Sequence, residues 1–144
     1  MATGHNLDDE AQSVMMNYLK GDIQRLMRLR PKREQPGLIP RIKPLRDIPE
    51  KEIALYCMVK GVFTHSRECP YAKLSLRADV RDMMNSLENL FPGTKQSTMQ
   101  GFKKLAGMAK GMRAQVDLGA CRKCGEPCVE ELCKACELLG KLNV

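Results

Sequence analysis

Residues 121–136 read CRKCGEPCVEELCKAC, and this stretch decides how the end of the chain is built. Cys121 and Cys124 form one C-x2-C pair, and Cys133 and Cys136 form a second pair after eight intervening residues. Each pair can bring two thiolates to one metal ion through a tight turn, and two pairs complete a closed tetrahedral site. The spacing therefore predicts a small module with a structural metal ion and no open position for a substrate.

Zinc is the expected ion, because four thiolates at short spacing suit it, and an iron centre is the alternative. Cys128 lies between the two pairs and could compete as a ligand, but the C-x2-C geometry argues against it. The chain has seven cysteines and no basic or apolar leader at its N-terminus. This combination indicates metal or redox chemistry, not a disulfide framework, and we expect a cytoplasmic protein. No apolar run approaches the length of a membrane span, so we expect no membrane contact.

The residues before the module predict a mainly α fold. The chain holds 10 methionines, no tryptophan and only 4% aromatic residues, which favours a soft helical core. The clearest pattern covers residues 76–91, where Leu76, Val80, Met83 and Met84 begin an apolar stripe at helical spacing that ends before a Pro-Gly pair. Further helices are predicted over residues 7–20, 22–29, 47–60 and 94–112, with Asn6, Asp47 and Thr94 or Ser97 as caps.

A proline-rich, basic segment separates the predicted helices. Residues 30–49 hold five of the eight prolines, which predicts an extended loop with a short edge strand near residues 38–42. In the helix that follows, Cys57 lies on the predicted apolar face with Ile53, Ala54 and Met58, so we expect a core cysteine.

The net charge of +7 is concentrated in two stretches. Residues 25–46 hold eight basic residues and one acid, and residues 101–123 hold six basic residues and one acid. Such patches suit a polyanion, although a solvated basic surface is the alternative. The residues that we expect to contact RNA are Arg28, Arg30, Arg33, Lys103 and Lys104.

Three parts of the chain, in this order, resemble one family. They are GHNLDDEAQ at 4–12, IKPLRDIPE at 42–50 followed by ECPY at 68–71, and FPGTK at 91–95 followed by the cysteine module. They are similar to segments of the PP-loop ATPases that thiolate tRNA, the tRNA 2-thiouridine synthetases of the TtuA/TtcA type, in the branch of archaea and the eukaryotic cytosol. The resemblance covers essentially the whole chain but only the C-terminal half of such an enzyme. The family's Ser-Gly-Gly-x-Asp-Ser phosphate loop does not occur among the 144 residues.

The resemblance implies a helical C-terminal portion of a PP-loop α/β ATPase followed by the zinc module. Residues 1–29 would end the ATPase domain, residues 30–115 would form a helical tRNA-binding region, and residues 116–144 would bind zinc. The whole enzyme would replace the 2-oxygen of a tRNA uridine by sulfur through an adenylated intermediate. It would use ATP with Mg²⁺ and a four-iron iron–sulfur cluster, and a ubiquitin-like protein could donate the sulfur. We expect this chain alone to be inactive and to need the N-terminal half or a second copy.

The resemblance also assigns roles to single residues. Asp8 and Asp9 would lie at the Mg²⁺ of ATP or at the reacting uridine, with His5 and Asn6 as nucleotide contacts. The residues alone favour a different explanation of the two aspartates, the acidic first turn of a capped helix, and the resemblance reverses that order. Cys69, in a loop, would be a cluster ligand or the sulfur-carrying cysteine. The rival hypothesis is a non-enzymatic zinc protein that binds RNA or another protein.

Overall fold

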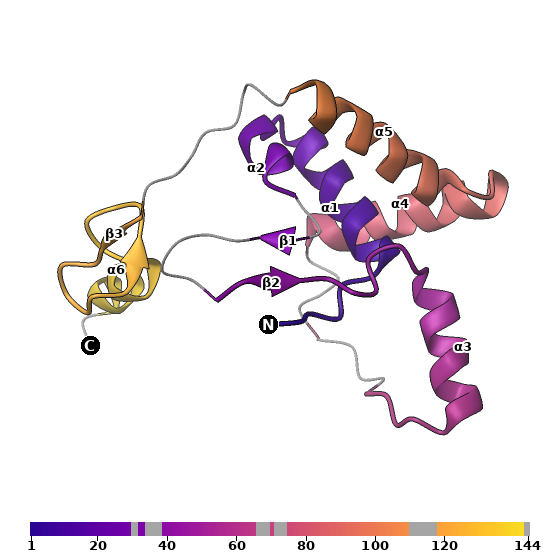
Figure 1. The fold of residues 1–144 in the computed structure, drawn as a ribbon, viewed down its shortest axis with the longest axis horizontal. Helices are drawn as coiled ribbons and strands as arrows, with labels where there is room; N and C mark the ends of the chain where they lie inside the picture. Colours follow the sequence, from indigo (N-terminus) through magenta and orange to yellow (C-terminus); the bar gives the residue numbers. More distant parts are fainter. Residues whose placement is uncertain (30–31, 34–38, 66–69, 71–74, 110–117, 143–144) are drawn as a thin grey trace.

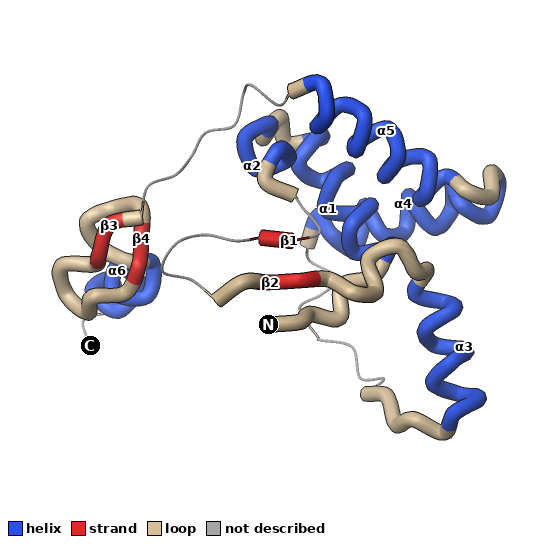
Figure 2. The backbone as a smooth tube through the Cα atoms, viewed as in Figure 1, coloured by secondary structure: helices blue, strands red, loops and turns tan. Residues whose placement is uncertain are grey.

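The structure is a computed structural model, and it describes residues 1–29, 32–33, 39–65, 70, 75–109 and 118–142. In these residues the helices are α1 (Leu7–Leu19), α2 (Ile23–Met27), α3 (Glu50–Lys60), α4 (Leu76–Leu90), α5 (Thr94–Met108) and α6 (Lys134–Lys141). Four two-residue strands accompany them: β1 (Lys32–Arg33), β2 (Arg41–Ile42), β3 (Gly119–Ala120) and β4 (Pro127–Cys128). Figure 2 shows how far helix outweighs strand, as the sequence predicts.

Helix α1 begins and ends where the sequence predicts. The backbone N–H of Asp9 donates to Oδ1 of Asn6 at 2.9 Å, and the N–H of Asn6 donates to the Asp9 carboxylate at 3.3 Å. This reciprocal pair satisfies two N–H groups that the first turn would otherwise leave unpaired. After α1, Gly21 takes a left-handed conformation, with φ of 66°, which glycine adopts without steric cost.

The core lies where α1 packs against α2, α4 and α5 (Figure 1). Met84 and Met99 are almost completely buried there, which confirms the expectation of a methionine-rich helical core. The buried apolar side chains of this cluster are Leu7, Ala11, Val14, Leu26, Val80, Met84, Met99 and Phe102. Residues 7–26 and 80–102 therefore share one hydrophobic core.

Two of the predicted helix caps are wrong. Pro49, not Asp47, is the N-cap of α3, and its side chain cannot accept the bond that Asp47 was expected to accept. The first N–H of α3, on Glu50, instead donates to Oδ2 of Asp8 at 2.7 Å, so a carboxylate of α1 satisfies it. Gly93, with φ of 93°, precedes α5 in place of Thr94 or Ser97. The predicted end of this last helix, at residue 112, lies outside the described residues.

The apolar face predicted for α3 is not part of the core. The structure buries none of the residues of α3, and Cys57 is only half-buried. The expectation of a core cysteine is therefore wrong for the described structure, because α3 does not pack extensively against any described helix or strand. Figure 1 shows α3 projecting away from α1, α4 and α5.

A small β structure connects the start of the chain with the proline-rich segment. Strand β2 pairs antiparallel with β1, so a strand does occur near residues 38–42, but the expectation of an edge strand is wrong because Ile42 has a partner on each side. On its other side, Ala2 forms a parallel bridge with Ile42. The N–H of Thr3 donates to the carbonyl of Ile42 at 3.0 Å, and the N–H of Ile42 donates to the carbonyl of Met1 at 2.9 Å. Along the chain, α1, α2 and β1 all lie between these two parallel segments.

The cysteine module comprises the antiparallel pair β3–β4 and helix α6, at the left of Figure 1. Gly125 has φ of 76° and donates its N–H to the carbonyl of Cys121 at 2.9 Å, so it supplies the turn after the first C-x2-C pair. Among the residues described, none of the helices combines the length and apolar character that a membrane span needs.

Candidate metal centre and N-terminal carboxylates

The four cysteines of the two C-x2-C pairs converge on one point. The sulfur atoms of Cys121, Cys124, Cys133 and Cys136 all lie within 4.8 Å of one another. Cys124 is exposed and the other three are buried, so the group is closed by protein on one side. Four sulfurs at such separations can surround one tetrahedral metal ion, as the sequence predicts.

Backbone N–H groups point at the sulfurs. The N–H of Cys133 donates to Sγ of Cys121 at 3.2 Å, and the N–H of Cys136 donates to Sγ of Cys133 at 3.4 Å. The first of these bonds is the main cause that lowers the pKa of the Cys121 thiol to about 6. The contact with Cys124 raises the pKa of Cys136 to about 12. Since a second thiolate beside the first is costly, a cation is needed to hold all four sulfurs ionised.

Cys128, the cysteine left over by the motif, lies in β4 and packs against the group without being one of the four. Its thiol donates to the carbonyl of Glu130 at 2.9 Å. The spare thiol therefore has a hydrogen-bond partner away from the four-cysteine centre.

Asp8 joins three helices. It is 5% exposed, and its carboxylate forms an ion pair with Lys95 at the start of α5 while it accepts the N–H of Glu50 at the start of α3. Lys95 also donates to Oδ1 of Asn85 on α4 at 2.7 Å. Among the described residues each oxygen of Asp8 has one partner, which leaves it a second lone pair through which a cation could bind. The contacts in the structure are those of a residue that fixes the helices relative to one another.

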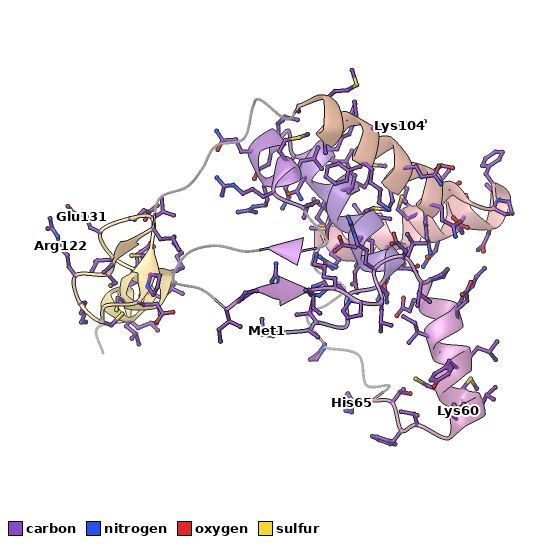
Figure 3. All side chains as sticks on the ribbon, viewed as in Figure 1. Met1, Lys60, His65, Lys104, Arg122 and Glu131 are labelled. Atoms are coloured by element: carbon purple, nitrogen blue, oxygen red, sulfur yellow. The ribbon has the colours of Figure 1, made fainter. Side chains whose placement is uncertain are left out.

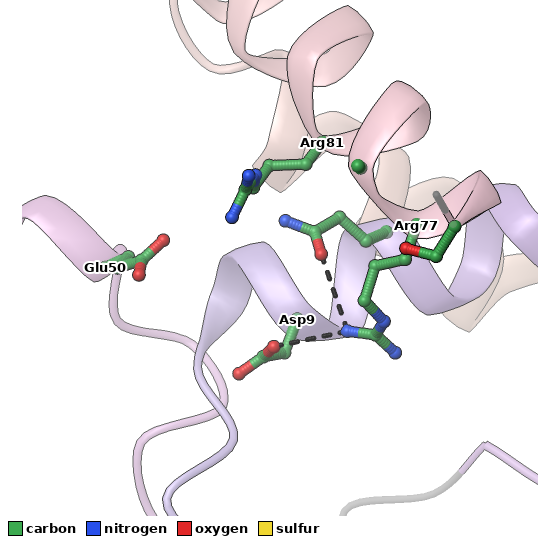
Figure 4. Close-up of a pocket in the computed structure, with 7 residues that line it drawn as sticks. Asp9, Glu50, Arg77 and Arg81 are labelled. Carbon is green, nitrogen blue, oxygen red and sulfur yellow. Dashed lines mark hydrogen bonds and ion pairs between the residues drawn. The ribbon is translucent and has the colours of Figure 1, made fainter. Parts of the chain in front are cut away.

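Asp9 takes part in the capping box of α1 and forms an ion pair with a residue of α4. Besides its bonds with Asn6, it accepts a bond from Arg77 of α4 at 3.3 Å. Figure 4 shows Arg77 reaching across to Asp9 in a pocket of about 150 Å³ that Arg81 and Glu50 also line. The two guanidinium groups are potential ligands of a phosphate.

His5 and Asn6 have structural contacts near this point. The ring Nδ1 of His5 lies 3.0 Å from the hydroxyl of Thr3, and Asn6 caps α1. The structure thus brings His5, Asn6, Asp8 and Asp9 together at the start of α1, as their sequence spacing requires.

Sequence reasoning missed Glu10, the most deeply buried acid at this end of α1. Glu10 is 1% exposed, and its carboxylate forms ion pairs with Lys43 and with Arg46, the latter at 3.2 Å. Two of the eight basic residues counted between residues 25 and 46 are therefore neutralised inside the protein. The tandem acidic residues 8–10 could have indicated a buried partner, but nothing local identifies which one.

The structure describes the side chains of three of the five residues expected to contact RNA, and it does not describe the loop cysteine. Arg28, Lys103 and Lys104 are exposed, and Figure 3 labels Lys104 on α5. Lys103 pairs with the exposed Asp47 at 3.1 Å, a surface pair that is easily exchanged. Arg30 and Cys69 lie outside the described residues, as does the side chain of Arg33.

Known proteins resemble this chain along its whole length. The tRNA 2-thiolation protein NcsA of Haloferax volcanii is 38% identical over 99% of the chain, which covers 48% of that protein. The cytoplasmic tRNA 2-thiolation protein 1 of Xenopus laevis is 39% identical over 99% of the chain, which covers 42% of it. No family model matches the chain.

The same relationship appears in three dimensions. The U34-tRNA thiolase NcsA of Methanococcus maripaludis, solved with its 4Fe–4S cluster, superposes with a TM-score of 0.76 at 38% identity. The match covers 99% of this chain and 45% of that one, so the chain spans less than half the length of the relatives it matches. These findings confirm the resemblance inferred from the three sequence segments. Over its whole length, the chain is similar to the C-terminal half of the tRNA 2-thiolation proteins.

Proposed function

We propose that this chain forms the C-terminal part of an ATP-dependent sulfurtransferase that converts a tRNA uridine to 2-thiouridine. The observation that carries the proposal is the match to the U34-tRNA thiolase, which joins 38% identity with a TM-score of 0.76 over 99% of the chain. Uridine 34 is the proposed target because the matched structure is that of a U34-tRNA thiolase. The chain alone lacks a phosphate-binding loop in its sequence, so we expect no thiolation without an N-terminal half.

In this proposal the four-cysteine group holds a zinc ion that stabilises the module. Four thiolates within 4.8 Å, two of which receive backbone N–H bonds, are a donor set suited to zinc. Zinc has no redox chemistry, so the ion would fix the fold of residues 116–144 and leave sulfur transfer to another site. A cluster at this centre is the alternative that metal analysis would reveal.

The basic residues are proposed to hold the tRNA backbone. Arg28, Lys103 and Lys104 have exposed side chains, and Arg30 and Arg33 belong to the same set by sequence. Phosphate contacts of this kind give affinity without sequence specificity. Residues 30–115 would thus form the tRNA-binding region between the end of the ATPase domain and the zinc module.

The aspartates and the loop cysteine are proposed to serve the chemistry of the whole enzyme. Asp8 and Asp9 would edge the site of ATP and Mg²⁺, with His5 and Asn6 beside them, and the free lone pairs of Asp8 allow a cation contact. Cys69 would be a ligand of the four-iron cluster or carry the sulfur. The remaining partners in this proposal are an N-terminal half or a second copy, and a ubiquitin-like sulfur donor. The relative named a cytoplasmic protein supports a cytoplasmic location.

The experiment that tests the proposal is a hybrid enzyme. The N-terminal part of NcsA from Methanococcus maripaludis, up to the start of the match, is joined to this chain. The hybrid should form 2-thiouridine in tRNA when ATP and a sulfide source are present, whereas neither half alone should do so. A folded hybrid that binds ATP and tRNA but forms no 2-thiouridine would contradict the proposal.

A further inference from the structure

Arg77 and Arg81 line the pocket of about 150 Å³ that lies between α1, α3 and α4 (Figure 4). They are four residues apart on α4, so their side chains lie next to each other on one face of the helix. The other residues that line this pocket are Asp9, Gln12, Glu50, Ser75 and Ala78. Neither arginine belongs to the two basic stretches in which the sequence predicts contacts with RNA.

Arg77 is held in place by α1. Its Nη1 donates to Oδ1 of Asp9 at 3.3 Å and to Oε1 of Gln12 at 3.4 Å. Its Nη2 donates to Oγ of Ser13 at 3.3 Å. Because all three acceptors belong to one helix, they fix the orientation of the guanidinium group. A guanidinium group has five N–H donors, so these bonds leave donors for a further acceptor in the pocket.

Arg81 has a weaker attachment to the protein. Its ion pair among the described residues is with Asp82 at 3.8 Å, and the side chain of Asp82 is 77% exposed. A pair of this kind in water contributes little to stability and is readily exchanged. Figure 4 shows Arg81 extending from α4 toward the side of the pocket where Glu50 lies. Arg81 can therefore bind a ligand in the pocket without breaking a strong contact.

Gln12 offers an unused donor to the same pocket. The residue is 5% exposed, and its side-chain oxygen accepts the bond from Arg77. Among the described residues, nothing accepts a hydrogen bond from its amide nitrogen. Every fully enclosed side-chain nitrogen or oxygen in the described part of the chain has a partner, so this nitrogen is open to the pocket that Gln12 lines. An unused donor on a mostly buried side chain indicates a place for an acceptor that the protein itself does not supply.

The charges around the pocket favour an anion with a single charge. Helix α4 begins here, with Ser75 as its N-cap, so the positive end of the helix dipole adds to the two guanidinium groups. Asp9 and Glu50 place two carboxylates around the same space, and these oppose a doubly charged anion more than a singly charged one. A phosphodiester of RNA carries one charge, whereas a terminal phosphate carries about 1.5–2.

We infer that this pocket binds one phosphodiester of the tRNA backbone, with Arg77 and Arg81 as its charged ligands and Gln12 as a neutral donor. This inference rests on the proposed function, in which tRNA is the polyanion that the chain binds. Guanidinium and amide N–H groups are common donors to phosphate oxygens in nucleic-acid complexes. Since Asp9 lines the same pocket, the contact would hold the RNA backbone beside a residue that is proposed to edge the ATP site.

The test measures the affinity of the chain for an unmodified tRNA transcript at several salt concentrations. Arg81→Ala should weaken binding about tenfold at low salt and reduce the salt slope by up to about one, because a charged phosphate contact is lost. Arg81→Lys should retain most of the affinity, because it keeps the charge. Gln12→Glu keeps an acceptor for Arg77 but replaces the amide donor with a charge that repels phosphate, so it should also weaken binding. Circular dichroism should show that all three variants remain folded.

The control is Lys60→Ala, which removes one positive charge from an exposed position at the end of α3. It should change the affinity for tRNA by no more than about twofold, because a single exposed charge away from the pocket is screened by salt. If Arg81→Ala and Gln12→Glu bind tRNA as tightly as Lys60→Ala, or if the wild-type chain binds no tRNA, the inference is wrong.

The hybrid enzyme separates the two sources of phosphate. If Arg81→Ala weakens the binding of ATP to the hybrid and leaves the binding of tRNA unchanged, the pocket serves the nucleotide and the inference is wrong. Weakened tRNA binding with unchanged ATP binding supports it. A hybrid that forms no 2-thiouridine, while Arg81→Ala still weakens tRNA binding by the chain, would count against the proposed function alone.

Discussion

Replacing the buried Glu10 by alanine should be one of the most destabilising single changes in the helical part of the protein. The substitution removes the only carboxylate that the described structure places against Lys43 and Arg46. The side chains of these two residues are 8% and 6% exposed, so water cannot replace the lost partner without local opening.

The magnitude follows from this burial. Removing one partner of a buried ion pair costs about 3–5 kcal/mol, because the other charge stays buried and uncompensated. A flexible lysine can extend its amine toward water, so we expect a loss near the lower end, about 3 kcal/mol. For a domain of about 100 residues this corresponds to a fall of roughly 12–24 °C in Tm. Glu10→Gln should lose less, because its amide oxygen can still accept a hydrogen bond.

Urea unfolding followed by far-UV circular dichroism measures the difference, with Glu52→Ala as the control. Glu52 is an exposed residue of α3, and its loss should change the free energy of unfolding by less than about 0.5 kcal/mol. A loss below about 1 kcal/mol for Glu10→Ala would refute the reasoning, since it would show that Lys43 and Arg46 do not depend on this carboxylate.

Three further predictions concern the metal, the RNA and the α4–α5 turn. Purified protein should contain about one zinc ion per chain; Cys121→Ser should lose it and Cys128→Ser should keep it, and equal loss in both would overturn the ligand assignment. Combining Arg28→Ala with Lys104→Ala should weaken tRNA binding and reduce the slope of log affinity against log salt concentration by about two, because each residue would lose one phosphate contact. An unchanged slope would show that neither side chain contacts the tRNA. Burial acts to raise the pKa of Glu88, but the N–H bonds from Lys95 and Gly93 outweigh it and hold the pKa below its usual 4.5. The stability from Glu88 should therefore be present above pH 4.5 and fade as pH falls below it, so that the Tm difference between wild type and Glu88→Gln narrows in acid; a constant difference would contradict this.

Some local features of this protein could be predicted from its sequence, although the caps expected at Asp47 and at Thr94 or Ser97 were not among them. The cap at Asn6 and the stop at Gly21 depend on side chains within three residues of the helix ends, and both are confirmed. The convergence of the four cysteines is confirmed as well, because each C-x2-C turn positions its own two sulfurs.

Contacts between distant residues could not be predicted. Glu10 pairs with residues 33 and 36 positions away, and Asp8 caps α3 from 42 positions away, so no local pattern distinguishes them from surface acids. The apolar stripe of α3 predicts a core face, but the structure buries none of its residues, because the sequence does not state what covers the helix. An apolar pattern predicts that a helix is buried, but not by which partner.

The most direct test of the central proposal is the content of 2-thiouridine in tRNA treated with the hybrid enzyme, measured by mass spectrometry of nucleosides. We predict that the hybrid with Cys69 forms 2-thiouridine, that Cys69→Ala abolishes it while zinc content and folding are unchanged, and that Cys57→Ala leaves it near the wild-type level. Near-normal 2-thiouridine with Cys69→Ala would contradict the role of Cys69. No 2-thiouridine from a folded hybrid that binds ATP and tRNA would contradict the assignment of this chain to tRNA thiolation.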